Sequence, residues 1–183
     1  MNHSGVMYMK IIIYASEYGS TKQYAMELSE KTGIMAVDYR KLDDINRYNT
    51  IIYLGGLYAG GILGMKKTFS KISDVSAKRI IIATVGLADV SDKNNTTTIR
   101  KNIKGQLSDD VYNQAHIYFL RGAIDYSRLG LKHKTMMALL YRKAKRLNEN
   151  QKTAEIKVMI ETYGKKVSFI DFNSLNPIID EIK

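Results

Sequence analysis

Six consecutive residues near the start of the chain have the types and spacing that suit the binding of a phosphate group. The segment Ser16–Thr21, here called the phosphate loop, lies between an apolar run and a helical pattern. A helix N-terminus offers unpaired N–H groups and a partial positive charge to an anion. Ser16, Ser20 and Thr21 add hydroxyl donors, and Gly19 lets the main chain approach without a Cβ atom. The loop therefore predicts a site for a phosphate monoester that needs no lysine or arginine.

A plain strand-to-helix turn, capped by serine or threonine, would use the same residue types. On these six residues alone, that reading stays open. The loop lacks the lysine of a Walker A motif and the spacing of G-x-G-x-x-G. Neither a nucleoside triphosphatase nor a classical dinucleotide-binding fold is therefore favoured.

The elements that must position this loop are strands that alternate with helices. Strands of a parallel sheet are apolar on both faces, which is the pattern of the strongest runs. The predicted strands are Lys10–Tyr14, Met35–Asp38, Thr50–Leu54, Arg79–Val85 and Gln114–Leu120. The predicted helices begin after the phosphate loop and end at Gly33, then cover about 63–72 and 97–107. This alternation indicates stacked βαβ units, and we expect one α/β domain over residues 1–183 with a leader at 1–8.

The pattern changes after the fifth strand. Residues 122–150 are predicted to form a basic helical insert with a helix over 132–147, and another helix follows near 153–163. The basic helix can lie on an anionic membrane, cover an active site, or be solvated and pack by its apolar stripe on the sheet. Asn173 or Ser174 is the expected N-cap of a last helix that carries Pro177 in its first turn.

Composition limits the classes of partner and chemistry. A net charge of +10 implies attraction to nucleic acid, an anionic membrane or acidic proteins, but no nucleic-acid motif is present and we do not expect that partner. The absence of cysteine excludes disulfides, thiolate metal sites and cysteine nucleophiles. Three scattered histidines give no metal-ligand spacing, so no metal site is expected. No apolar run is long enough to span a bilayer, and we expect a cytoplasmic address, at most peripheral to the inner membrane face.

The stretch Lys10–Gly33 resembles the start of a flavodoxin. The phosphate loop of that family reads Ser or Thr, two residues, Gly, one residue, Thr, and Ser16, Gly19 and Thr21 hold those places. The resemblance extends to a predicted glycine-rich turn at 55–61, to a predicted turn at 84–89 and to the strand–helix order, so it covers nearly the whole chain. It implies a three-layer α/β/α sandwich with a five-stranded parallel sheet in the order 2-1-3-4-5. It also implies flavin mononucleotide (FMN) as the cofactor, bound at the switch point between strands 1 and 3.

The same resemblance implies which residues face the flavin. Tyr58 is expected to stack on the ring, unless it is a surface tyrosine on a glycine-rich turn. No aromatic residue follows Asp89, so one flavin face is expected to be open, and Asp89 caps the next helix in the alternative reading. The expected FMN-binding residues are Ser16, Glu17, Tyr18, Gly19, Ser20, Thr21, Gly56, Leu57, Tyr58, Ala59, Gly60, Thr84, Val85, Gly86 and Asp89.

The segments Arg121–Tyr126 and Thr135–Arg142 are similar to the matching region of the menaquinone-dependent protoporphyrinogen dehydrogenases. This similarity implies an FMN-dependent oxidoreductase that acts on a porphyrin-like or quinone-like substrate. It assigns no catalytic acid or base, although Arg121 and Tyr126 are candidates. Classical flavodoxins are one-electron shuttles and are acidic, which suits basic partners. The alternative hypothesis is that this basic chain is an electron-transfer flavodoxin whose redox partner protein is acidic. A flavin-free binding module is the third hypothesis.

Overall fold

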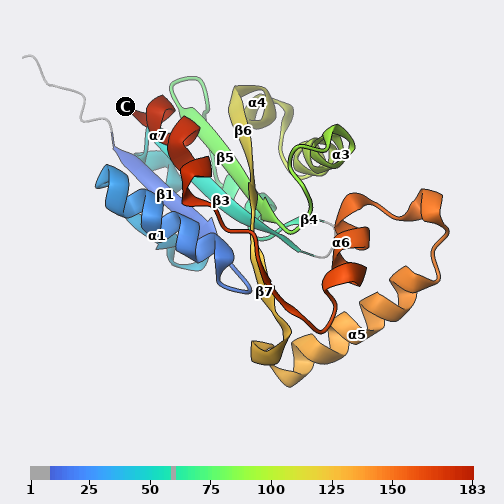
Figure 1. Ribbon diagram of the computed structural model, residues 1–183. Helices are drawn as coiled ribbons and strands as arrows, with labels where there is room; N and C mark the ends of the chain where they lie inside the picture. Colours follow the sequence, from blue (N-terminus) through green and yellow to red (C-terminus); the bar gives the residue numbers. More distant parts are fainter. Residues whose placement is uncertain (1–8, 59–60) are drawn as a thin grey trace, which may run out of the picture.

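The structure is a computed structural model that describes residues 9–58 and 61–183 (Figure 1). Its larger sheet is built from β1 (Lys10–Ala15), β2 (Ala36–Asp38), β3 (Thr50–Tyr58), β4 (Gly61–Ile62), β5 (Arg79–Gly86) and β6 (Ala115–Arg121). The helices around it are α1 (Ser20–Thr32), α2 (Met65–Phe69), α3 (Lys93–Lys104), α4 (Asp109–Gln114) and α7 (Asn176–Ile182). Between β6 and α7 the chain forms β7 (Ala123–Asp125), α5 (Leu131–Lys145), α6 (Ala154–Thr162) and β8 (Lys166–Ser168).

Five strands are parallel and lie in the order β2-β1-β3-β5-β6, which confirms the predicted fold class and strand order. The short β4 adds one antiparallel pairing to the end of β3. The register aligns Ile12 with Ile52 and Ile52 with Ile81, so the three central strands present matching side chains to each face.

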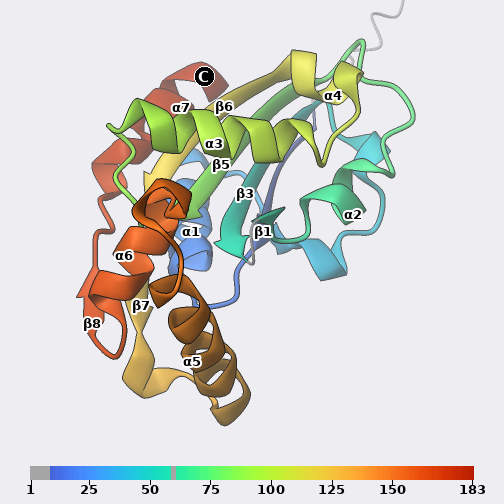
Figure 2. The ribbon, with the colours of Figure 1, turned by 90° about the vertical axis from the view of Figure 1, so that its right-hand side faces the viewer.

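Each face of the sheet buries its own apolar cluster. Ile12, Ile52 and Ile81 point towards α1 and α7, whose buried residues include Leu28 and Ile178. The neighbouring strand residues point to the opposite face and pack against α2, α3 and α4. Because successive side chains of a strand alternate between faces, unbroken isoleucine runs are what a sheet covered on both sides requires. The result is three layers, and in Figure 2 α3 lies in front of the sheet and α1 behind it.

Most predicted elements are present, with differences at their ends. Gly33 ends α1 in the left-handed conformation at φ 70°, as expected of a C-cap glycine. Helix α3 begins four residues earlier than expected, because the Asp92 side chain accepts a hydrogen bond from Asn94 N and caps it. The predicted N-cap of the last helix is wrong: Asn173 and Ser174 lie in a 3₁₀ turn, and α7 follows with Pro177 in its first turn, as expected.

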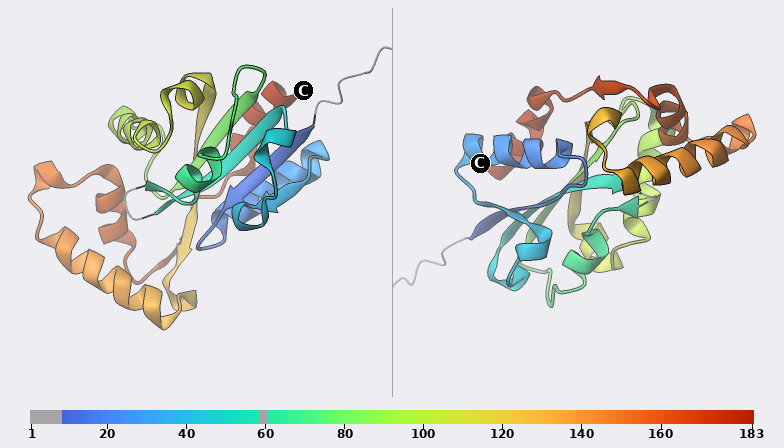
Figure 3. Two further views of the ribbon diagram at one scale, coloured as in Figure 1. Left: turned by 180° about the vertical axis from the view of Figure 1, so that it is seen from behind. Right: turned by 90° about the horizontal axis from the view of Figure 1, so that it is seen from below.

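The segment between β6 and α7 lies beyond the carboxyl ends of the central strands (Figures 1 and 3). Strands β7 and β8 pair antiparallel, from Ala123 opposite Ser168 to Asp125 opposite Lys166. Residues 123–168, here called the cap, are therefore one connected unit that contains α5 and α6. Among the described residues no helix is both long and apolar enough to cross a bilayer.

Candidate cofactor site

Strands β1, β3 and β5 run side by side to the carboxyl edge of the sheet (Figure 2). The register pairs Ala15 with Gly55 and Gly55 with Thr84, so the residues that follow these positions emerge at one level. The chain order makes β1 and β3 neighbours, with β2 on the outer side of β1. This is the switch point where ligands bind in open α/β sheets.

The phosphate loop leaves the start of α1 open to an anion. Gly19 is the N-cap residue at φ 94°, and no side chain caps the helix. Its N–H donates to Ser16 Oγ over 3.1 Å, which fixes the loop from within. The following N–H groups of the first helical turn lack intrahelical acceptors by the geometry of an α-helix. This arrangement is an N-terminal anion site formed by main-chain donors.

Ser20 plays a different part from the one that the sequence predicts. Its Oγ donates to Ala123 O over 3.0 Å and accepts from Ala123 N over 2.9 Å. The hydroxyl therefore ties the start of α1 to β7 and is not a free donor for a phosphate. Thr21 is 3% exposed, and a Cβ atom on Gly56 would lie 3.2 Å from its Oγ1. Helix α1 thus approaches β3 closely at Gly56, where a larger residue would have to displace the Thr21 side chain slightly.

Strand β3 is longer than the glycine-rich sequence suggests. Strand β3 continues through Gly55 and Gly56 to Tyr58, and Leu57 pairs with Ile62 of β4. The predicted turn at 55–61 is therefore wrong over most of its length, because the glycines fit a strand. Ala59 and Gly60, both expected to bind the cofactor, lie outside the described residues.

Helix α5 covers this edge of the sheet. His133 Nε2 lies 2.8 Å from Glu17 Oε1 of the phosphate loop. The Tyr58 hydroxyl donates to Met136 Sδ over 3.2 Å, and the Tyr18 ring lies 6.3 Å from the Tyr58 ring. The alternative in which α5 packs by its apolar stripe on the sheet is wrong, since that stripe belongs to a third cluster, formed with other residues of the cap and with Tyr18 and Leu87.

Two enclosed hydroxyl groups at this edge have no hydrogen-bond partner among the described residues. They belong to Tyr18 and to Thr84, which is 1% exposed at the end of β5. Burial raises the pKa of Tyr18 to about 12, so its phenol stays protonated at neutral pH. Unpaired buried hydroxyl groups are costly, and a ligand with polar atoms would satisfy them. Together with the uncapped helix start, they fit a phosphorylated cofactor.

Gly86, the last residue of β5, is overlain by Glu155, a residue that the sequence did not identify. A Cβ atom on Gly86 would collide with Glu155 Oε1 from α6 and with Leu57 Cδ1. Glu155 is half-buried, and its Oε1 accepts from Ala88 N over 3.2 Å. Desolvation raises the pKa of this carboxyl group, against the hydrogen bonds from the turn and the charge of Arg121. No spacing rule links position 155 to position 86, so sequence alone gave no signal.

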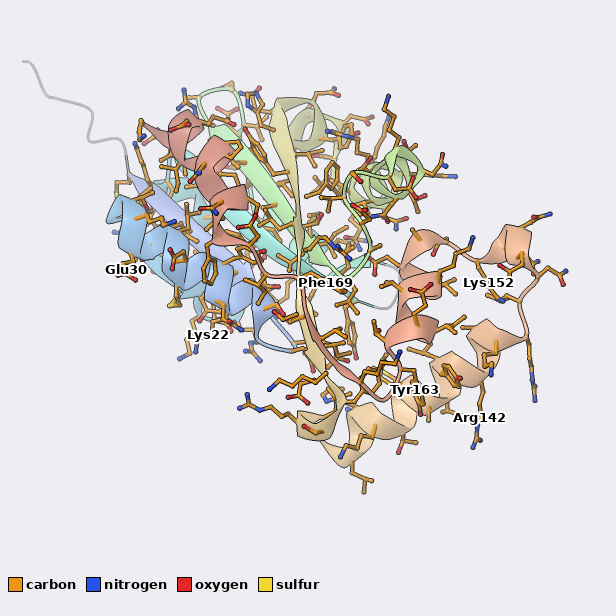
Figure 4. The ribbon with its side chains drawn as sticks, viewed as in Figure 1. Lys22, Glu30, Arg142, Lys152, Tyr163 and Phe169 are labelled. Carbon is orange, nitrogen blue, oxygen red and sulfur yellow. The ribbon has the colours of Figure 1, made fainter. Side chains whose placement is uncertain are left out.

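Three other candidates in this region have structural roles. Val85 is a buried strand residue, and the Arg121 guanidinium donates to Leu87 O over 2.9 Å and lies over the ring of Phe169, which Figure 4 labels. Asp89 is exposed and accepts from Ser91 N, which lowers the pKa of its carboxyl group. Because Asp92 caps α3, the reading of Asp89 as that cap is wrong.

Tyr126, the other candidate acid or base, is 7% exposed and packs edge-on against Tyr163 at 5.2 Å. Burial raises its pKa to about 12, and its hydroxyl has no partner among the described residues. A phenol in this state can donate a hydrogen bond but cannot act as a base at neutral pH.

We expect Glu155→Gln to flatten the pH dependence of stability. Because the pKa is raised in the folded protein, the unfolded chain ionises first as the pH rises. The contribution of Glu155 to stability is therefore fully present below the ordinary pKa of glutamic acid. It is lost as the pH rises from that pKa to the raised pKa of the folded protein. The amide introduced by the substitution keeps an acceptor for Ala88 N but cannot ionise. Urea unfolding at mildly acidic and mildly alkaline pH measures this, with exposed Glu161→Gln on the same helix as the control. If the free energy of unfolding changed equally with pH in the wild type and in Glu155→Gln, the raised pKa of Glu155 would be contradicted.

Within residues 9–58 and 61–183, no three histidine or carboxylate side chains gather where they could hold a metal ion. An open hollow of about 490 Å³ borders the edge, lined by Tyr58, Gly61, Ile62, Leu63, Gly64, Lys66, Lys67 and Gln106. A second, of about 440 Å³, lies along α1 beside Lys22 and Glu30, which Figure 4 labels.

Among solved structures, the chain is similar to one described as a flavoprotein from Bacteroides uniformis, with 14% identity and a TM-score of 0.46. That match covers 63% of this chain and 92% of the other. A flavodoxin variant from Fusobacterium nucleatum, with bound FMN, shows 18% identity over 66% of this chain and 73% of its own, at a TM-score of 0.40. A flavodoxin variant from Pseudomonas aeruginosa shows 14% identity over 75% of this chain and 97% of its own, at a TM-score of 0.40.

No curated protein sequence matches the chain. The family described as the flavodoxin domain matches residues 11–151, which includes the phosphate loop, all strands of the larger sheet and α5. The match spans more than half of the sequence and agrees with the observed strand order. On these grounds the chain belongs to the flavodoxin domain family.

Proposed function

We propose that the protein binds FMN at the carboxyl edge of its sheet and takes part in electron transfer. The observation that carries this proposal is the uncapped start of α1 behind Gly19, at the switch point between β1 and β3. A helix N-terminus in this place is suited to a terminal phosphate. Membership of the flavodoxin domain family supports the choice of cofactor.

Different residues of the site would hold the phosphate and the ring of FMN. Main-chain N–H groups of the phosphate loop, with the Ser16 and Thr21 hydroxyls, would hold the phosphate. Leu57, Tyr58 and Tyr18 would supply apolar and aromatic surface for the ring, and the Thr84 hydroxyl would find a polar partner. The flavin, once bound, supplies one-electron and two-electron redox chemistry, while the protein orients it and excludes water.

We further propose that the protein is an oxidoreductase of the protoporphyrinogen-dehydrogenase-like branch, acting on a planar porphyrin-like or quinone-like substrate. The cap supports this reading, because α5 reaches over the edge through the contact of Met136 with Tyr58 and the contact of His133 with Glu17. An edge that a helix partly covers suits a small substrate better than a protein-to-protein shuttle, whose flavin must meet its partner. A shuttle that serves an acidic redox protein is the alternative, and the charge of +10 is what favours it.

Titration of FMN with cofactor-free protein tests the first proposal. We expect saturable quenching of flavin fluorescence at one FMN per chain, with much weaker binding of riboflavin, which lacks the phosphate. Equal affinity for both would remove the phosphate loop from the site, and no binding by folded protein would overturn the proposal.

A second experiment separates the enzyme from the shuttle. Anaerobic turnover of protoporphyrinogen with a quinone supports the enzyme. A stable flavin semiquinone without such turnover supports the shuttle.

A further inference from the structure

Helix α5 carries an unusual concentration of unpaired positive charge. Six lysine and arginine residues occur between positions 131 and 147, and no aspartate or glutamate does. None of the six forms a salt bridge within the described part of the chain. They are Lys132, Lys134, Arg142, Lys143, Lys145 and Arg146. The helix is therefore a cationic surface that no acidic residue of the described chain neutralises.

The same helix exposes large apolar side chains to solvent. Leu131 is 83% exposed, Leu139 61% and Leu140 38%. Three of the five large exposed hydrophobic residues in the described chain thus lie on α5, and the other two are Met26 and Met35. Exposed leucines next to unpaired cations are not needed to pack the fold, because nothing in the described part of the fold covers them.

The orientation of α5 is fixed by its opposite side. Met137 and Ala144 are buried against the cap, and the Tyr141 ring stacks on Tyr163 at 4.1 Å. At 3.6 residues per turn these positions form one stripe, so Leu131, Leu139 and most of the cations face the other way. Figure 4 shows Arg142 pointing away from the body of the protein, and Figure 3 shows α5 extending beyond the three layers.

We propose that this outer face of α5 binds the surface of an anionic phospholipid bilayer. The cations would meet lipid phosphates, and the two leucines would enter the headgroup boundary, as in helices that lie in the membrane interface. Cations alone would serve any polyanion equally well. The exposed leucines favour a surface with an apolar layer directly beneath its charge. The proposal is independent of FMN binding, although it places the cofactor edge beside the membrane.

Sedimentation with phosphatidylcholine vesicles, with and without phosphatidylglycerol, tests the proposal on the full chain. We expect binding that requires phosphatidylglycerol and weakens with salt. Arg142→Gln with Lys143→Gln should lower the partition coefficient about 25-fold, since each cation near such a surface contributes about a factor of five. Leu131→Ser with Leu139→Ser should lower it about tenfold at unchanged charge.

Matched controls lie elsewhere on the surface. Lys93→Gln with Lys101→Gln removes two exposed cations from α3, and Met35→Ser removes a side chain that is 62% exposed. Both controls should change binding less than about twofold, and circular dichroism verifies that every variant is folded. Failure of the wild type to bind, equal binding to uncharged vesicles, or equal losses in the controls would overturn the proposal. The proposal would also be overturned if the protein bound duplex DNA as strongly as it binds the anionic vesicles and the leucine variant bound those vesicles as the wild type does. That result would identify a general polyanion site.

Discussion

Replacing Gly19 with valine will lower the affinity for FMN by about 100-fold, or about 2.7 kcal/mol. Gly19 has φ 94°, and a β-branched residue is strongly disfavoured at positive φ. No atom lies within 4 Å of the position that a Cβ would take, so the effect comes from the backbone and not from a clash. A loop relaxed to negative φ would turn its N–H groups away from the phosphate. Fluorescence titration of both proteins measures the change.

Gly33→Val is the matched control for this strain. Gly33 has φ 70°, also with no atom within 4 Å of its Cβ position, but it lies at the other end of α1. Both variants should lose stability to a similar extent, whereas Gly33→Val should bind FMN as the wild type does. Parallel losses of affinity in the two variants would show that the phosphate loop has no special part in binding.

Ser20→Ala will lower the free energy of unfolding by about 2–3 kcal/mol and change FMN affinity little. The hydroxyl makes two hydrogen bonds with Ala123, and its removal leaves an N–H and a C=O group of β7 without those partners. Chemical denaturation measures this loss. Ser76→Ala removes an exposed serine that bonds only to exposed Asp74, and should cost less than about 0.5 kcal/mol. A large loss of FMN affinity with unchanged stability would restore Ser20 as a phosphate ligand.

The sheet could be predicted from sequence because its signals are local. Runs such as Ile11 to Ile13 are apolar at every position, which a strand covered on both faces requires and a surface strand does not. Gly33 marked the end of α1 because one residue there must adopt positive φ. The six-residue helix α4 has too few turns to show a periodic pattern, and its sequence signal is confined to the N-cap Ser108 and the acidic residues Asp109 and Asp110.

The site could be predicted less completely, because its contacts join distant parts of the chain. Ser20 bonds to a residue 103 positions away, and Glu155 reaches a turn 67 positions before it. The glycines of β3 looked like a turn because glycine is common in turns. Gly55 is required for another reason: a Cβ atom there would collide with Ile62 and Tyr53. Tertiary packing, and not local conformation, decides these positions.

The contacts of α5 with the phosphate loop have a kinetic consequence. A molecule held beneath Tyr58 and Glu17 can leave when Met136 and His133 move aside. Such gating slows entry and exit by the same factor, so it lengthens the residence time without changing the equilibrium constant. The rate of cofactor release would then depend on the motion of α5 as well as on the strength of the phosphate contacts.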